Sequence, residues 1–199
     1  LRQIHDFIDA SDCFPGVIVR GGVNYFLWDR DNRGNCLIVT HKGSEINEPV
    51  ERPLLENDLD VFIRYNEAVE ILRKIKKFNE KKFDKLVSSR RPFGLDSTYR
   101  GKTINSEDAL VLYQKGGKSY IPREEIRSNV QMIDKWKIYI PFLGSGDDSF
   151  PNIILGKPFI GKPKTVCTET YLTIGPFDSF DECKNVVTYI STRFFRFLV

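Results

Sequence analysis

Residues 165–182 read "TVCTETYLTIGPFDSFDE", and this stretch decides the fold because a strand signal runs directly into a helix signal. Side chains alternate in character along residues 165–175, which is the period of a β-strand. The "SFDE" that follows places a serine three residues before a glutamate, and this capping-box pattern predicts a helix with Ser179 as its cap and Glu182 at its third position. Strand and helix therefore adjoin here.

The predicted C-terminal helix carries an apolar stripe that runs to the last residues of the chain. Arg193 and Arg196 lie off this stripe, so they are free to face solvent or a phosphate. No glycine or other stop signal follows Leu198, and we expect the helix to continue past Val199 in the intact protein. The stripe consists of Phe180, Cys183, Val187, Ile190, Phe194 and Phe197.

The rest of the chain mixes short strand-like runs and loops with the end of one helix and a second, longer helix. Residues 1–12 have the apolar spacing of a helix end, and a helix opened by Asn57 or Asp58 is predicted over residues 61–78. The acidic, proline-containing residues 44–60 read as a linker, with a domain boundary near residue 48. The expected strands are 17–20, 23–28, 36–40, 109–114, 135–141 and 153–154.

No βαβ period and no internal repeat connects these elements. The predicted fold class is therefore α/β of the mixed α+β type, with a small, twisted, mostly antiparallel sheet and flanking helices. Residues 29–35, "DRDNRGN", suit a hairpin connection. Gly21 and Gly22 permit a sharp bend, a bulge, or a close approach of the backbone to a neighbour.

Composition narrows the class of protein. Hydrophobic residues make up 41% of the 199 residues, which is enough for a packed core. No apolar run is long enough to span a bilayer, so we expect a cytoplasmic protein without a membrane partner. The four cysteines form no CxxC pair and are accompanied by only two histidines, which favours reduced core cysteines over a zinc site.

Positive charge is concentrated in one segment. Residues 73–102 hold 11 basic and 3 acidic residues, and such a segment suits a polyanion, although a solvated surface is the alternative interpretation. Loops there and further along interleave basic side chains with tyrosines, which suits DNA. The candidate phosphate contacts are Arg90, Arg91, Lys102, Lys118 and Lys162, and the candidate base-reading residues are Tyr99, Arg100 and Arg123.

Most catalytic signatures are missing from the sequence. It contains no GxxxxGK[ST], no GxSxG and no HExxH motif. Glu80 and Lys82 make the E-x-K half of a nuclease site, but Asp58 and Asp60, the upstream carboxylates, are expected to open a helix instead of lying on a strand. A magnesium-dependent restriction endonuclease domain therefore stays an alternative. An interaction module that docks a partner through its last helix is a third.

Four blocks of sequence carry a resemblance to a known family. They resemble the end of the catalytic domain and the target-recognition region of large adenine-specific DNA methyltransferases of bacterial restriction–modification systems, of the Type IIG-like kind. The blocks are "DCFPGVIVRGGVNYFLWDRDNRGNCLIV" (12–39), "PFGL" (92–95), "YIPREEI" (120–126) and "CTETYLTIGPFDSFDECKNVVTYISTRFFRFLV" (167–199). The resemblance implies that residues 1–48 close a methyltransferase sheet and that residues 49–199 form a target-recognition domain.

The resemblance also implies what lies outside this sequence. The family's Asn-Pro-Pro-Tyr motif and its glycine-rich S-adenosylmethionine loop are both absent, and we expect them before Leu1. The chain itself would then need no cofactor and would not be catalytic, and its partners would be double-stranded DNA and an N-terminal catalytic domain that uses S-adenosylmethionine. The recognition domain would hold the duplex while the catalytic domain extrudes the target adenine.

Overall fold

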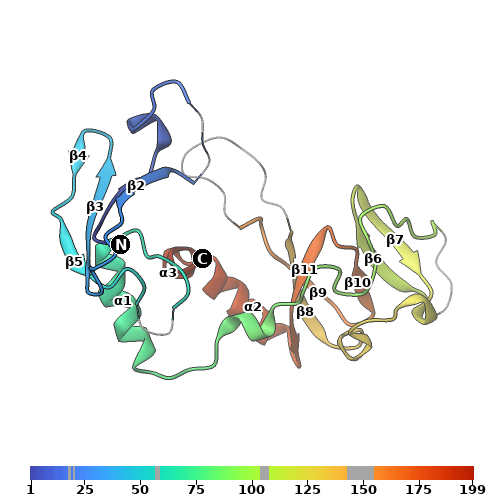
Figure 1. Ribbon diagram of the computed structural model, residues 1–199. Helices are drawn as coiled ribbons and strands as arrows, with labels where there is room; N and C mark the ends of the chain where they lie inside the picture. The colour runs from blue at the N-terminus through green and yellow to red at the C-terminus, as the bar shows by residue number, and fades with distance from the viewer. Residues whose placement is uncertain (18, 20, 57–58, 104–107, 143–154) are drawn as a thin grey trace. The chain divides into compact units, whose positions relative to one another are not determined.

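A computed structural model describes residues 1–17, 19, 21–56, 59–103, 108–142 and 155–199. The chain divides into two compact units, Leu1–Glu80 and Lys81–Val199. Both units mix strands with helices, which confirms the predicted mixed α+β class (Figure 1). The division falls between residues 80 and 81, whereas the sequence indicated a boundary near residue 48. The assignment of residues 1–48 and 49–199 to separate roles stays a prediction.

The first unit is built on a five-stranded sheet in the order β2-β1-β3-β4, with β5 also paired to β3. β1 runs parallel to β3, and the remaining pairs are antiparallel. The strands are β1 (Gln3–Phe7), β2 (Val23–Leu27), β3 (Cys36–Lys42), β4 (Glu45–Ile46) and β5 (Val50–Arg52).

Two sequence predictions for this unit are wrong. Residues 1–12 were expected to end a helix, but residues 3–7 form a strand in which Ile4 and Asp6 are buried while their neighbours are partly exposed. Pairing with β2 on one side and β3 on the other overrides the helical spacing. The expected linker at 44–60 contains β4 and β5. The strands predicted at 23–28 and 36–40 are confirmed, and the one at 17–20 includes residues outside the described part of the chain.

The single α-helix that the structure describes in this unit, α1, spans Asn66–Lys76 and begins later than predicted. The carbonyl groups that precede it are used elsewhere. Thr40 donates its hydroxyl hydrogen to the carbonyl of Arg64 at 3.1 Å, and Arg52 donates to the carbonyl of Ile63. These contacts hold residues 63–64 against the sheet, so the helix starts after Tyr65. The predicted caps, Asn57 and Asp58, lie outside the described residues.

A partly buried ion pair between Arg64 and Asp6 lies beside the glycine pair of the first unit. Arg64 donates from Nε and Nη2 to the two carboxylate oxygens of Asp6, at 2.7 and 2.8 Å, and from Nη1 to the carbonyl of Gly21 at 2.6 Å. A Cβ atom on Gly22 would lie 2.2 Å from the carbonyl oxygen of Phe7. Of the three alternatives for the glycine pair, the structure shows a close approach of backbone at Gly22, whereas a Cβ atom on Gly21 would meet nothing within 4 Å.

The second unit contains two three-stranded sheets among its described residues. One has the order β10-β6-β7 and includes a parallel β10–β6 pair; the other has the order β11-β8-β9 and is antiparallel. The strands are β6 (Leu110–Gln114), β7 (Gly117–Ile121), β8 (Trp136–Pro141), β9 (Phe159–Gly161), β10 (Thr165–Cys167) and β11 (Tyr171–Phe177). The predictions at 109–114 and 135–141 are confirmed, and residues 153–154 lie outside the described part.

Residues 165–177 form two strands, β10 and β11, instead of one. The predicted strand over residues 165–175 breaks at Thr168–Thr170, so that β10 and β11 belong to different sheets. Thr168 donates its backbone N–H to Tyr113, Glu169 donates to Leu95, and Tyr171 donates back to Thr168 at 3.1 Å. The chain turns here because these amide groups find partners outside a single ladder, and the turn places Glu169 against the loop that precedes β6.

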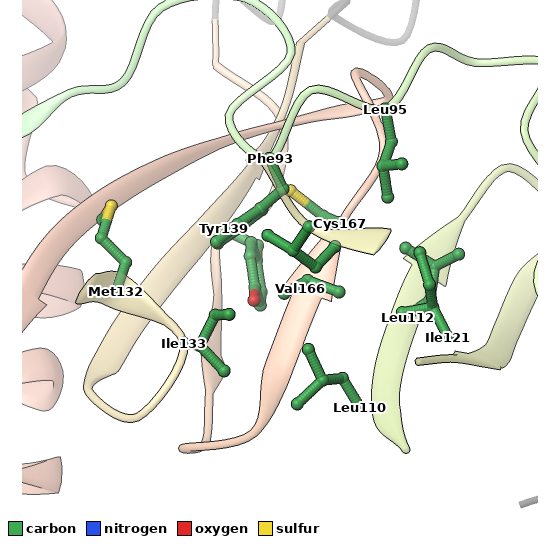
Figure 2. Close-up of a cluster of buried hydrophobic side chains, with 11 residues drawn as sticks. Phe93, Leu95, Leu110, Leu112, Ile121, Met132, Ile133, Tyr139, Val166 and Cys167 are labelled. Carbon is green, nitrogen blue, oxygen red and sulfur yellow. The ribbon is translucent and has the colours of Figure 1, made fainter. Parts of the chain in front are cut away.

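Among the described residues, the core of this unit has two clusters. The larger one joins residues of both sheets, and Figure 2 shows Leu112 and Ile121 on one side, Met132 and Ile133 on the other, and Val166 between them. The smaller one lies where α2 (Phe180–Ile190) packs against β8 and β11. All four cysteines of the chain are free thiols; Cys36, Cys167 and Cys183 are buried as predicted, whereas Cys13 is partly exposed. No described helix is long and apolar enough to cross a bilayer.

The C-terminal helix begins as predicted and ends earlier. Ser179 accepts a hydrogen bond from the backbone of Glu182, and the Glu182 side chain accepts one from the backbone of Ser179, which confirms the capping box. The helix ends at Ile190, and Thr192 caps a separate helix, α3 (Arg193–Leu198), by accepting from the backbone N–H of Phe195 at 3.1 Å.

The break in the helix shifts the apolar stripe. Phe195 is 8% exposed, whereas Phe194, which the stripe predicted to be buried, is 41% exposed. Phe180 and Phe197 are also substantially exposed, while Cys183 and Ile190 are buried as expected. The expectation of one continuous helix through residue 199 is therefore wrong within the described chain.

Candidate functional site

The best-organised charged group of the second unit is centred on Glu169. Its Oε2 atom accepts hydrogen bonds from Nε of Arg90 at 3.1 Å and from Nε of Arg91 at 2.8 Å. Its Oε1 atom accepts from the backbone N–H of Ser97 at 3.2 Å. The Glu169 side chain is only 8% exposed, so one buried carboxylate holds both ends of the 90–97 loop.

Electrostatics keep this carboxylate charged. Hydrogen bonding from the Arg91 guanidinium is the main cause that lowers the pKa of Glu169 to about 2. Hydrogen bonds from Ser97 and Arg90 lower this pKa further, while partial desolvation acts in the opposite direction. The same hydrogen bond raises the pKa of Arg91. Glu169 is therefore ionised at neutral pH, and the two arginines share one negative charge.

The two arginines remain open to solvent on their other side. Their side chains are 61% and 54% exposed, and both use Nε to reach Glu169. Among the described residues, no hydrogen bond engages their Nη groups. The Arg90 guanidinium also lies over the Phe142 ring, 5.4 Å from its centroid. An arginine fork with free Nη donors suits a phosphate or carboxylate ligand.

Two further predicted residues lie in the same loop. Arg100 donates from Nη1 to the carbonyls of Ser97 and Tyr99, at 2.7 and 2.8 Å, so it is folded against the Ser97 end of the Glu169 group. The Tyr99 hydroxyl donates to the carboxylate of Glu125. Burial, with Glu125 nearby, raises the pKa of Tyr99 to about 12. The segment before β6 therefore carries Arg90 and Arg91 on Glu169 and Arg100 on the carbonyls of Ser97 and Tyr99.

Lys102 and Lys118 belong to the edge of the β10-β6-β7 sheet. The backbone of Lys102 exchanges two hydrogen bonds with Tyr120 in β7, at 2.7 and 2.9 Å. The Lys118 ammonium lies 5.2 Å from the centre of the Tyr113 ring. Since Lys118 and Tyr120 are two positions apart on one strand, their side chains share a face. Both lysines are exposed.

Arg123 and Lys162 lie near a third group of charges. Arg123 donates from both terminal nitrogens to the carboxylate of Asp134, so its fork is occupied within the unit. Exposed Lys162 lies in the β9–β10 turn, where its carbonyl accepts from the Lys137 ammonium at 3.3 Å. Lys137 is fully buried and donates also to the carbonyls of Ile133 and Thr165.

Sequence reasoning missed Glu169 and Lys137 as organising residues. Both are charged side chains within strand-like stretches of otherwise apolar or β-branched residues, and that pattern is the signal that could have found them. The structure describes all eight residues that were predicted to contact DNA. Their contacts with DNA stay predictions.

The nuclease alternative gains no support from the structure. Glu80 is the last residue of the first unit, and Lys82 directly precedes the short 3₁₀ turn at Phe83–Leu86 of the second. In the described part of the chain, no group of three or more histidine, cysteine, aspartate or glutamate side chains is arranged to hold a metal ion. Asp58 lies outside that part.

Comparison with known proteins gives one partial similarity. Over 74 residues the chain is 34% identical to an uncharacterized adenine-specific methylase of Mycoplasma pneumoniae (strain ATCC 29342 / M129 / Subtype 1). That stretch covers 37% of this chain and 17% of the relative. No family model matches the chain, and no solved structure matches it. The similarity indicates a relation to methyltransferases over the matched stretch.

Proposed function

We propose that this chain is a sequence-specific recognition module for double-stranded DNA that works with an adenine-specific DNA methyltransferase. The observation that carries the proposal is the similarity to an adenine-specific methylase. The chain lacks the Asn-Pro-Pro-Tyr and glycine-rich motifs of such enzymes, so we assign methyl transfer and S-adenosylmethionine binding to a separate catalytic domain. In this proposal the module positions the DNA duplex and selects its sequence, and the separate domain catalyses methyl transfer.

The charge of the second unit supports a polyanionic ligand. Residues 81–199 contain 19 basic and 13 acidic residues, whereas residues 1–80 contain 11 basic and 14 acidic residues. Phosphate contacts supply most of the affinity of DNA-binding proteins and fix their orientation on the duplex. The exposed arginines at the Glu169 group are the best placed for such contacts, because a buried carboxylate orders them while no described residue occupies their Nη groups.

The roles of the other predicted residues follow from the same geometry. We assign phosphate contacts also to Lys102, Lys118 and Lys162, whose side chains are exposed. Arg100 is the best candidate for reading a base edge, since its Nη2 and Nε atoms have no partner among the described residues. Tyr99 and Arg123 would have to exchange Glu125 and Asp134 for DNA to take part in base readout.

A binding experiment tests the proposal. Duplex DNA labelled with a fluorophore is titrated with the chain at low salt, and binding is followed by anisotropy. We expect binding that weakens steeply as salt rises. The variant Arg90→Ala with Arg91→Ala should bind at least about tenfold more weakly, given that each charge-assisted contact contributes about 1–2 kcal/mol. The control Arg193→Ala with Arg196→Ala removes the same charge from α3 and should bind almost as well as the parent chain. An equal loss of affinity in both variants would show that DNA responds to overall positive charge and not to the arginines at Glu169.

A further inference from the structure

Glu169 presents an apparent contradiction for a DNA-binding surface. It is a carboxylate beneath the two arginines that are best placed to contact phosphate, and a negative charge there should repel DNA. Its contacts indicate a different role. It receives Arg90, Arg91 and the Ser97 amide, and all three come from the loop that precedes β6.

The geometry of these contacts determines which donors remain for a ligand. Both arginines bind Glu169 through Nε, and both use the same carboxylate oxygen. Because the guanidinium is planar and rigid, fixing Nε also fixes the direction of the two Nη groups. The carboxylate thus orders two flexible side chains before a ligand arrives. The conformational entropy of these side chains is then already lost in the free protein, so it does not weaken binding.

The backbone supports the same arrangement. Arg91 adopts a left-handed conformation with φ of 59°, and its carbonyl accepts from the backbone N–H of Gly94 at 3.0 Å. Glu169 itself is fixed because its backbone N–H donates to the carbonyl of Leu95 at 2.9 Å. Next to this turn, the side chains of Phe93 and Leu95 are buried in the larger core cluster. The loop, its arginines and the carboxylate are therefore anchored to the core of the second unit.

We infer that Glu169 is a positioning residue that holds Arg90 and Arg91 as one preorganised clamp for a phosphodiester group. This inference rests on the proposed DNA-binding function and goes beyond it by assigning a role to a residue of the wrong charge for DNA. The clamp keeps a net positive charge, since two guanidinium groups share one carboxylate.

The variant Glu169→Gln separates positioning from simple charge. It removes a negative charge beside the ligand, so electrostatics alone predicts tighter binding to duplex DNA. Glutamine has a single oxygen, which cannot serve both the arginines and the Ser97 amide, so a failure of positioning predicts weaker binding. We expect at least about a fivefold weaker affinity at fixed salt. We also expect the slope of log K against log salt to become shallower by about 0.9 for each phosphate that the variant no longer neutralises.

Two further variants complete the experiment. Glu124→Gln removes a carboxylate that is exposed and has no partner among the described residues, and it should leave affinity unchanged or slightly raised. Arg90→Lys with Arg91→Lys keeps both charges at exposed positions but removes the Nε donors and the fork. It should also weaken binding about fivefold, and it tests the clamp even if Glu169→Gln does not fold.

The outcomes distinguish this inference from the proposed function. If the parent chain binds duplex DNA and the double alanine variant does not, the proposed function stands. In that case, undiminished binding by Glu169→Gln, or by the double lysine variant, would overturn the positioning role. If the parent chain shows no duplex affinity at low salt, the proposed function fails first and the clamp fails with it.

Discussion

Arg91 donates its Nε hydrogen to Glu169 across 2.8 Å, although 78 positions separate the two residues in the sequence. This contact ties the loop before β6 to the turn between β10 and β11. Glu169 lies in the break between these two strands, where its backbone N–H donates to Leu95 and its side chain meets the arginine. The candidate site therefore depends on the break in the strand.

The first prediction concerns acid stability. The pKa of Glu169 is lowered to about 2 in the folded chain, chiefly by Arg91, from a usual value near 4.5. The unfolded chain therefore takes up a proton at higher pH than the folded chain, so the stabilising effect is complete above about pH 4.5 and is lost as pH falls toward 2. Urea denaturation across this range should show that the parent chain has a higher free energy of unfolding than Glu169→Gln near pH 4.5 and above, and that this difference shrinks as pH falls. A difference that stays constant with pH would contradict this expectation.

The second prediction concerns Gly22. Its φ is 77°, and a Cβ atom would lie 2.2 Å from the carbonyl of Phe7, so Gly22→Ala should lower the free energy of unfolding of the first unit by about 3 kcal/mol or more. Gly21→Ala is a matched control, because φ at Gly21 is 86° but a Cβ atom there would meet nothing within 4 Å. The control should cost only about 1–2 kcal/mol. Equal losses in chemical denaturation would show that the close approach is not the cause.

The third prediction concerns the cap of α2. Ser179→Ala removes the acceptor for the Glu182 backbone N–H and should cost about 1 kcal/mol of stability. Ser191→Ala provides the comparison, since Ser191 is exposed and its hydroxyl donates to the carbonyl of Val187 at the other end of the helix. Thermal unfolding followed by circular dichroism should give a clearly lower melting temperature for Ser179→Ala than for Ser191→Ala. The reverse order would rule out the capping box as the main start signal of the helix.

The fourth prediction concerns Lys137. Burial lowers the pKa of its ammonium group to about 8, while the unfolded value is near 10.5. Between these values the unfolded chain binds the extra proton, so the free energy of unfolding should rise as pH increases from about 8 to about 10.5. The variant Lys137→Met should lack this rise. Parallel pH profiles for the two proteins would mean that the amine is not desolvated as its burial indicates.

Local signals in the sequence predicted the elements that depend on local chemistry. The capping box at Ser179 and the strands around Tyr25 and Ile38 were predicted correctly, and the close approach at Gly22 was one of the alternatives that the glycine pair left open. Each depends on residues within a few positions of one another or on the special conformation of glycine. The mixed α+β class followed from the same signals.

Features that depend on distant partners were not predictable in this way. Residues 3–7 form a strand because two other strands flank them, and α1 starts late because Thr40 and Arg52 use the preceding carbonyls. At the candidate site the basic residues could be named from their clustering. The role of Glu169 could not be assigned, because nothing local indicates that the loop at residues 90–97 returns to it.

The central claim is that the second unit binds duplex DNA through the arginines held by Glu169. The most direct measurement is the affinity of the parent chain and of Arg90→Ala with Arg91→Ala for labelled duplex DNA across a salt series. We predict salt-sensitive binding by the parent chain, with a weaker affinity and a shallower salt dependence in the variant. Identical affinity and identical salt dependence in the two proteins would contradict the claim.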